Sequence, residues 1–323
     1  MNLIRRALNP PAYASSVPAF LTFLILDHPW VERFILYPSY QRYLSHHPTH
    51  LTQLSPVTAK ILQTLQHTGV CLSTLAELGY PDTDPFCRSS LNLFQDLPTS
   101  QNTSIIRATP SHFRAYPQTF TWGLQPQILN LVTAYLGTPP AYDGPFYTLS
   151  QPDNQEVAER VWHRDREDRK MLKIIIYFSD VDKSSSPFQW LTPEYSDALS
   201  DLVSQHRLYR YRTFLHRELQ HWLPTVEKKG LVSCLGQAGT VIFVDTARLY
   251  HRGKPPSTNP RSAAIFSYFS RRPWHPFFCN RTGLSPTDLE YLTQNCTDSQ
   301  KACVFWKQNL PQIARCIPRY QQL

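Results

Sequence analysis

Short apolar stretches recur along the middle of the chain and predict its β-strands. The clearest is 172–178, where every residue except Lys173 is aliphatic or aromatic. A run this short and this continuous is typical of a strand that is covered on both faces. Further strands are expected over 145–150, 161–165, 239–244 and 261–270.

Helical spacing of apolar residues predicts helices on both sides of these strands. The segment 55–69 has Ser55 as a helix N-cap, a proline in its first turn and Gly69 at its end. Apolar residues recur at helical intervals over 125–136, and Gly137 closes that helix. Weaker helical patterns cover 74–78, 193–204, 207–223, 285–294 and 299–309. The prolines of 81–104 instead predict an irregular segment.

This order of elements predicts an α+β fold with a mostly β core. Short strands between two groups of helices favour a double-stranded β-helix of the jelly-roll or cupin type, decorated with N- and C-terminal helices. We expect residues 1–50 to form an N-terminal arm and 51–323 to form a single domain. Within that domain the β core is expected at about 142–273 and a helical C-terminal tail at 283–323.

Composition narrows the class of protein. With 323 residues, 41% of them hydrophobic, the chain can bury a large core. The longest candidate for a membrane span, 20–26, has seven residues, whereas a spanning helix needs ~20. The net charge of +8 suits either a nucleic acid or anionic small molecules, but no basic run is interleaved with aromatic residues. We therefore expect a small-molecule substrate rather than a nucleic acid.

The cysteines bear on the compartment. There are seven of them, an odd number, and no two are spaced as C-x-x-C. This usage is typical of reduced thiols, so we expect a cytoplasmic protein. Arg5 and Arg6 leave an organelle-targeting peptide as the alternative to a structural arm over 1–50.

An H-x-D triplet inside W-H-R-D, 162–165, is the first sign of chemistry. In a strand, residues two apart project from the same face, so His163 and Asp165 would point to one spot. A second histidine, His251, follows the apolar run 239–244. Two histidines and one carboxylate on one face suit a divalent metal of the iron type and leave further positions open for small molecules.

Three more residues are candidates for binding an acidic ligand near that metal. Arg261 opens the last predicted strand, and its guanidinium can hold a carboxylate with two parallel hydrogen bonds. Lys173 interrupts an apolar strand, so it either pairs with a ligand carboxylate or reaches solvent along its stem. Tyr147 offers a phenolic donor from the preceding strand.

These motifs resemble those of the iron(II)- and 2-oxoglutarate-dependent oxygenases, most closely the phytanoyl-CoA dioxygenase-like branch. The resemblance rests on W-H-R-D at 162–165, L-K-I-I-I-Y-F-S-D-V-D at 172–182, Y-H-R-G-K-P-P at 250–256 and Arg261, and it covers roughly 120–275. It implies iron(II) on His163, Asp165 and His251, with Arg261 on the far carboxylate of 2-oxoglutarate. It also implies the use of O2 to hydroxylate a small-molecule C–H bond, with release of succinate and CO2. Many of these enzymes carry a glycine where this chain has Ser186.

Other assignments stay open at this level. A rival metal group at His216, Glu218 and His221 has helical spacing, which turns the first two side chains away from each other. A non-catalytic jelly-roll binding protein, a protein hydroxylase and a nucleic-acid demethylase of the same fold are the functional alternatives. The demethylases usually show a second arginine six residues after the first, where this chain has Ser267.

Overall fold

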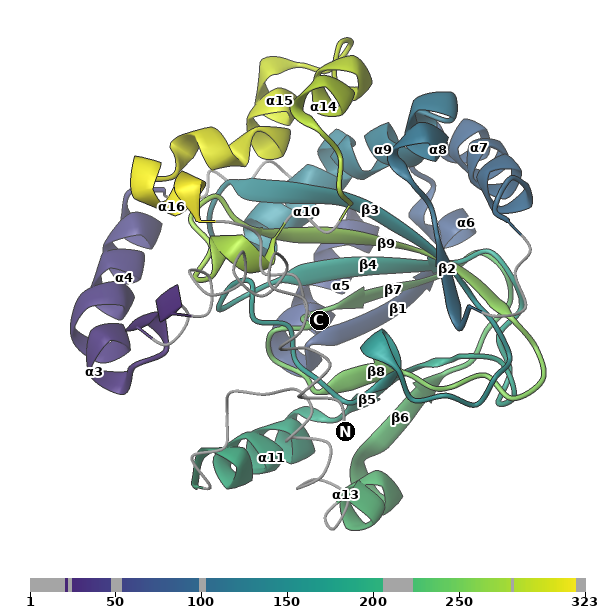
Figure 1. The fold of residues 1–323 in the computed structure, drawn as a ribbon, viewed down its shortest axis with the longest axis horizontal. Helices are drawn as coiled ribbons and strands as arrows, with labels where there is room; N and C mark the ends of the chain where they lie inside the picture. The colour runs from purple at the N-terminus through teal and green to yellow at the C-terminus, as the bar shows by residue number, and fades with distance from the viewer. Residues whose placement is uncertain are drawn as a thin grey trace, which may run out of the picture.

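The computed structural model describes residues 21–22, 25–47, 54–98, 103–205, 223–279 and 282–317, and its core is formed by two antiparallel sheets. Figure 1 shows the larger sheet across the centre of the molecule and the smaller sheet below it. The larger sheet has the order β1 (Val70–Thr74), β7 (Thr240–Val244), β4 (Leu172–Tyr177), β9 (Arg261–Ser270), β3 (Pro140–Ser150) and β2 (Ile105–Arg107). The smaller sheet has the order β6 (Leu231–Cys234), β5 (Phe188–Leu191) and β8 (His251–Gly253).

The strand order confirms the expected jelly-roll architecture. Neighbouring strands come from distant parts of the chain, and apolar residues of both sheets pack into one cluster between them. Two strands, β1 and β2, precede the interval 142–273 in which the β core was expected. β1 pairs over its whole length with β7, so its place in the sheet is set by a partner far away in sequence.

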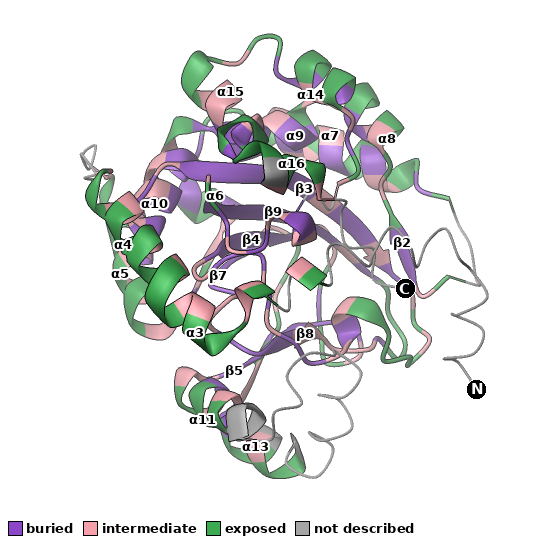
Figure 2. Ribbon diagram, turned by 60° about the vertical axis from the view of Figure 1, so that its left-hand side comes forward, coloured by how far each residue is buried: buried purple, intermediate pink, exposed green. Residues whose placement is uncertain are grey.

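Helices cover the outer face of the larger sheet, and Figure 2 shows buried strands beneath exposed helical surfaces. The helices that precede β3 are α3 (Pro29–Val31), the π-helical η1 (Glu32–Leu36), α4 (Tyr37–Ser45), α5 (Pro56–Thr68), α6 (Leu75–Leu78), α7 (Thr83–Gln95), α8 (Pro110–Ala115), α9 (Gln118–Thr121) and α10 (Pro126–Leu136). Those that follow β3 are α11 (Pro193–Gln205), α13 (Leu223–Gly230), α14 (Pro286–Leu292), α15 (Asp298–Val304) and α16 (Gln312–Cys316). Short 3-10 turns lie at Trp122–Leu124, Ala158–Arg160, Pro276–Phe278 and Trp306–Asn309.

The predicted boundaries of α5 and α10 are confirmed. The Ser55 hydroxyl accepts a hydrogen bond from the amide of Thr58 at 3.2 Å, as an N-cap does. Gly69 and Gly137 end the two helices with φ of 77° and 74°, in the left-handed region where glycine carries no Cβ penalty.

Two predictions of local structure are wrong. The segment 81–104 contains the helix α7, because Pro81 precedes the helix and Pro85 lies in its first turn, where a proline removes no helical hydrogen bond. The segment 161–165 is not a strand; it follows a 3-10 turn and forms a single β-bridge, between His163 and His251. The predicted helix 207–223 lies almost entirely outside the described residues, as does the rival histidine group within it.

The described part of the expected N-terminal arm, 25–47, is helical. It packs on the body of the protein through a contact of 3.1 Å between Nε2 of His275 and Oδ1 of Asp27, and through an ion pair of 2.6 Å between Arg169 and Glu32. Across the portions that the structure describes, no helix combines the length and the apolar character needed to cross a membrane.

Strand β4 shows how the sequence positions a charged group between the sheets. Leu172, Ile174 and Ile176 pack toward the helices, whereas Ile175 and Tyr177 pack toward the smaller sheet. Because side chains alternate along a strand, Lys173 lies on the same side as Ile175 and Tyr177. The structure therefore holds an ammonium group on the inner face of the jelly roll.

Candidate metal centre

His163, Asp165 and His251, here called the triad, converge on one point between the two sheets. One ligand atom from each residue lies within 4.8 Å of those of the other two, and the described residues contain no other such group. The Nε2 atom of His163 is 4.0 Å from Oδ1 of Asp165, and Nε2 of His251 is 3.9 Å from Oδ2. The three residues are 4, 5 and 4% exposed, so the site is shielded from bulk water.

The main chain holds the triad in register. The amide of His163 donates to the carbonyl of His251 at 3.1 Å, and the amide of His251 donates back at 2.9 Å. The amide of Asp165 donates to the carbonyl of Thr246 at 2.9 Å. This bridge does what the predicted strand was expected to do: it directs His163 and Asp165 to the same side and brings the distant His251 beside them.

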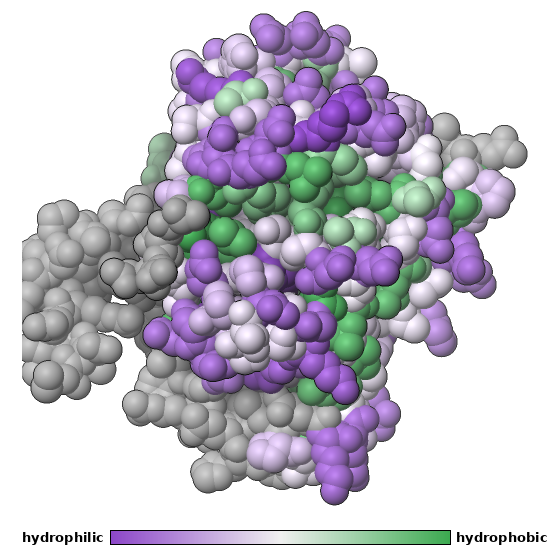
Figure 3. Space-filling view, turned by 90° about the vertical axis from the view of Figure 1, so that its right-hand side faces the viewer, coloured by the Kyte–Doolittle hydropathy of each residue, from purple (hydrophilic) through white to green (hydrophobic). Residues whose placement is uncertain are grey.

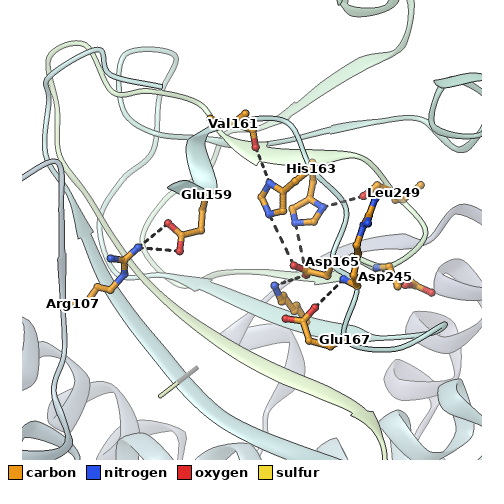
Figure 4. A network of polar contacts seen from close by, with 12 residues as sticks. Arg107, Glu159, Val161, His163, Asp165, Glu167, Asp245 and Leu249 are labelled. Carbon is orange, nitrogen blue, oxygen red and sulfur yellow. Dashed lines mark hydrogen bonds and ion pairs between the residues drawn. The ribbon is translucent and has the colours of Figure 1, made fainter. Parts of the chain in front are cut away.

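Hydrogen bonds to the backbone orient both imidazole rings, and Figure 4 shows His163 between Val161 and Asp165. Nδ1 of His163 lies 2.7 Å from the carbonyl oxygen of Val161, and Nδ1 of His251 lies 2.9 Å from that of Leu249. A carbonyl only accepts, so each Nδ1 carries the hydrogen, and in the neutral ring Nε2 presents its lone pair toward Asp165. This is the tautomer that a metal ligand requires.

The residues on either side of His163 and His251 contact one another by cation–π interactions. The Arg252 guanidinium lies 4.7 Å from the ring centre of the buried Trp162, and that of Arg164 lies 5.1 Å from the ring of Tyr250. Arg252 is held further by its Nε, which donates to Oε1 of Gln189 at 2.9 Å. These contacts fasten the segment around His163 to β8 and so support the spacing of the two imidazoles.

Lys173 contacts the triad directly. Its Nζ forms an ion pair with Oδ2 of Asp165, and the residue is only 6% exposed. The alternative in which Lys173 reaches solvent along its stem is therefore wrong. The ammonium lies beside the carboxylate that a metal ion would use, so a bound metal would have to share or replace this contact.

Arg261, Ser186 and Gly253 are here called the arginine cradle. Arg261 and Gly253 line the same cavity as His163 and His251. Nη1 of Arg261 donates to the Ser186 carbonyl, and a Cβ at Gly253 would lie 3.4 Å from Nη2 of Arg261. Nε of Arg261 and Oγ of Ser186 have no hydrogen-bond partner among the described residues, although both are buried. Burial also lowers the pKa of Arg261, and the cost of burying this cation falls when an anion lies beside it.

The structure does not bring Tyr147 to this cavity. Its hydroxyl lies 2.8 Å from Oγ of Ser90, and its ring packs among the helices on the outer face of the larger sheet. Burial raises its pKa. The neighbouring Phe146 lines the cavity instead, because adjacent residues of a strand face opposite sides.

Several cavity residues were not found by sequence reasoning. They include Asp143, Glu159, Phe188, Thr246 and Ile265. Glu159 accepts two hydrogen bonds of 3.0 Å from Arg107, a pair that Figure 4 shows away from the triad. Of these, only Thr246 could have been inferred from the sequence, because it lies between the apolar run 239–244 and His251.

The triad fits a ferrous ion by its donor chemistry. Two neutral imidazoles and one carboxylate, buried together and oriented from one side, are the donor set of non-haem iron(II) sites with open positions. The arginine cradle fits a carboxylate: the planar guanidinium has an unused Nε donor, and its Nη atoms lie beside the space that a side chain at Gly253 would fill. His163 and His251 of the triad line the same cavity as Arg261 and Gly253 of the cradle, so a metal and an acid could be held together.

No family model and no curated protein matches the chain. Its fold is similar to that of SnoK, described as a non-heme alpha ketoglutarate dependent carbocyclase from nogalamycin biosynthesis, at 15% identity and a TM-score of 0.46 over 69% of this chain and 87% of that chain. It is also similar to EctD from S. alaskensis with bound Fe, at 14% identity and a TM-score of 0.47 over 74% of this chain and 90% of that chain. With identities and TM-scores this low, any assignment of activity rests on the triad and the arginine cradle.

Proposed function

We propose that the chain is a non-haem iron(II)- and 2-oxoglutarate-dependent dioxygenase that hydroxylates a C–H bond of a small molecule, with release of succinate and CO2. The observation that carries this proposal is the buried triad, whose two histidines line the same cavity as Arg261 and Gly253 of the arginine cradle. A metal site alone would suit many reactions, but a metal site with a guanidinium ready for a dicarboxylate favours this one.

In this proposal each residue has a defined part. His163, Asp165 and His251 hold iron(II), and Arg261 binds the far carboxylate of 2-oxoglutarate with its Nε and an Nη. When bound, iron and 2-oxoglutarate supply the activation of O2 for C–H oxidation. The protein orients the imidazoles through the carbonyls of Val161 and Leu249 and keeps bulk water out by burying the site.

Apolar surfaces favour an organic substrate. Phe146, Phe188 and Ile265 line the cavity beside its polar groups, as is usual for small-molecule sites. Figure 3 shows a band of apolar side chains between two hydrophilic zones on the face that it presents. The apolar lining of the cavity fits a molecule with a hydrocarbon portion.

The test is iron-dependent formation of succinate from 2-oxoglutarate. We expect H163A, D165A and H251A to abolish it, because each removes one of the three metal donors of the triad. R261A should mainly raise the concentration of 2-oxoglutarate required. H67A, a change at an exposed histidine of α5, is the matched control and should keep full activity. Full activity of D165A would contradict the ligand assignment.

A non-catalytic jelly-roll binding protein is the second candidate. The observation that favours it is the ion pair between Lys173 and Asp165, which gives the carboxylate a cation without any metal. This candidate predicts no uptake of Mn(II), Co(II) or Fe(II) by the purified protein and no succinate when iron is supplied. A metal titration followed by calorimetry separates the two candidates before any substrate is known.

A further inference from the structure

Lys173 and Arg261 lie at different ends of the cavity. Lys173 pairs in register with Ser267 of β9, whereas Arg261 is the first residue of that strand. The Arg261 guanidinium lies 6.0 Å from the ring of Tyr177, which is four residues after Lys173 on the same face of β4. Four residues of strand span roughly 13 Å. The two cations are therefore placed to serve different anionic groups.

A metal ion on the triad would change the surroundings of Lys173. Its ammonium now pairs with Oδ2 of Asp165, and both residues are buried. A divalent cation that takes over this carboxylate leaves a second positive charge beside it in a poorly hydrated space. Such an arrangement is costly unless another anion joins the site.

Two hydroxyl residues near Lys173 in the fold also indicate a ligand. Thr246 is fully buried and lines the cavity, and its Oγ1 has no hydrogen-bond partner within the described part of the chain. It follows Val244, the β7 partner of Lys173, by two residues. Ser267, the β9 partner of Lys173, lines the cavity as well. The backbone register therefore places one ammonium and two hydroxyls, all on residues that line the cavity, in the same region of the fold.

We propose that Lys173, Thr246 and Ser267 form a subsite beside the metal for a carboxylate of the organic substrate. This inference rests on the proposed function and extends it by naming the substrate class, a carboxylic acid. A carboxylate fits better than a phosphate group, because the subsite offers one point charge and short hydroxyl donors with no guanidinium fork among its members. In 2-oxoglutarate, by contrast, the far carboxylate goes to Arg261.

The test uses acetate as the probe and Mn(II) as a paramagnetic reporter that does not support turnover. Wild-type protein is loaded with Mn(II) and 2-oxoglutarate, and the relaxation of the acetate methyl protons is measured as acetate is added. We expect a saturable enhancement with acetate and none with acetamide, which has nearly the same shape but no charge. K173M should weaken acetate binding by at least about tenfold, as expected for the loss of a charge-assisted hydrogen bond, while K173R retains part of it.

Two further measurements decide which carboxylate Lys173 serves. The affinity for 2-oxoglutarate, followed by calorimetry on the Mn(II) protein, should change by less than about twofold in K173M, since Arg261 holds the cosubstrate. T246V should also weaken acetate binding, and it leaves the Lys173–Asp165 pair untouched if K173M folds poorly.

These measurements distinguish a failure of the proposed subsite from a failure of the proposed function. Equal acetate binding by wild type, K173M and T246V overturns the subsite, and so does a K173M protein that loses 2-oxoglutarate affinity by the same factor as acetate affinity. A wild-type protein that binds Mn(II) and 2-oxoglutarate but not acetate overturns this inference alone. A protein that takes up neither Mn(II) nor 2-oxoglutarate overturns the proposed function and the subsite with it.

Discussion

Adding one methyl group at Gly253 tests the arginine cradle with the smallest possible change. In Gly253→Ala the new Cβ would lie 3.3 Å from Oγ of Ser186, 3.4 Å from Nη2 of Arg261 and 3.7 Å from Nη1. The two shorter distances are tighter than ordinary van der Waals contact, so the guanidinium or the serine has to move by a few tenths of an ångström. The methyl group also fills space in which a carboxylate would lie.

The expected loss of 2-oxoglutarate affinity follows from the cost of overpacking. Inserting a methyl group into a well-packed site typically costs ~1–3 kcal/mol. If about 1.4 kcal/mol of this is paid only when a ligand is bound, the affinity for 2-oxoglutarate falls about tenfold. Gly253 is the last residue of β8 and its φ does not require glycine, so the fold and the triad are expected to stay intact.

The assay is calorimetry of 2-oxoglutarate binding to the Mn(II)-loaded protein, with metal affinity as the internal control. The double variant Gly253→Ala, Ser186→Gly removes the shortest of the new contacts, because Oγ of Ser186 is gone. It should recover part of the lost affinity. Unchanged 2-oxoglutarate affinity in Gly253→Ala would refute the placement of the cosubstrate carboxylate next to Gly253.

Three further predictions concern the surroundings of the site. Arg252→Met removes the contact with Trp162 and the hydrogen bond to Gln189, so metal affinity should fall several-fold more than 2-oxoglutarate affinity, as two separate titrations would show. Burial raises the pKa of Asp168 to about 6, above its unfolded value of ~3.9, so its contribution to stability is present below pH 4 and is lost as the pH rises through 6. Urea unfolding between pH 4.5 and 7 should show a decline of up to about 3 kcal/mol from this group, and the decline should be smaller in Asp168→Asn; an identical pH profile would contradict it. Tyr147→Phe removes only the hydrogen bond with Ser90, so we expect a loss of about 1 kcal/mol of stability by chemical denaturation and no change in 2-oxoglutarate affinity; weaker cosubstrate binding would show that the outer-face placement is wrong.

The candidate site was largely predictable because its chemistry is local in sequence. His163 and Asp165 are two residues apart, and His251 follows a recognisable strand, so their convergence needed only the right fold class. The geometric reason differed from the expected one: a single β-bridge, not a strand, directs the first two side chains.

The faces of the strands were harder to predict. Alternation alone does not say which face of β3 is inside, and a register shift between Tyr142 and Pro145 moves the pattern. Tyr147 was therefore placed on the wrong side, and Phe146 and Asp143 were missed. Lys173 was recognised as unusual, but its contact with Asp165 depends on how β4 meets the segment that carries His163 and Asp165.

The bridge between His163 and His251 joins two segments that are far apart in the sequence. The two imidazoles become neighbours only when β8 lies beside the segment around His163, so a polypeptide that has produced the first histidine alone cannot assemble the triad. Under the proposed function, an iron ion would therefore find its three donors together only once both segments are in place.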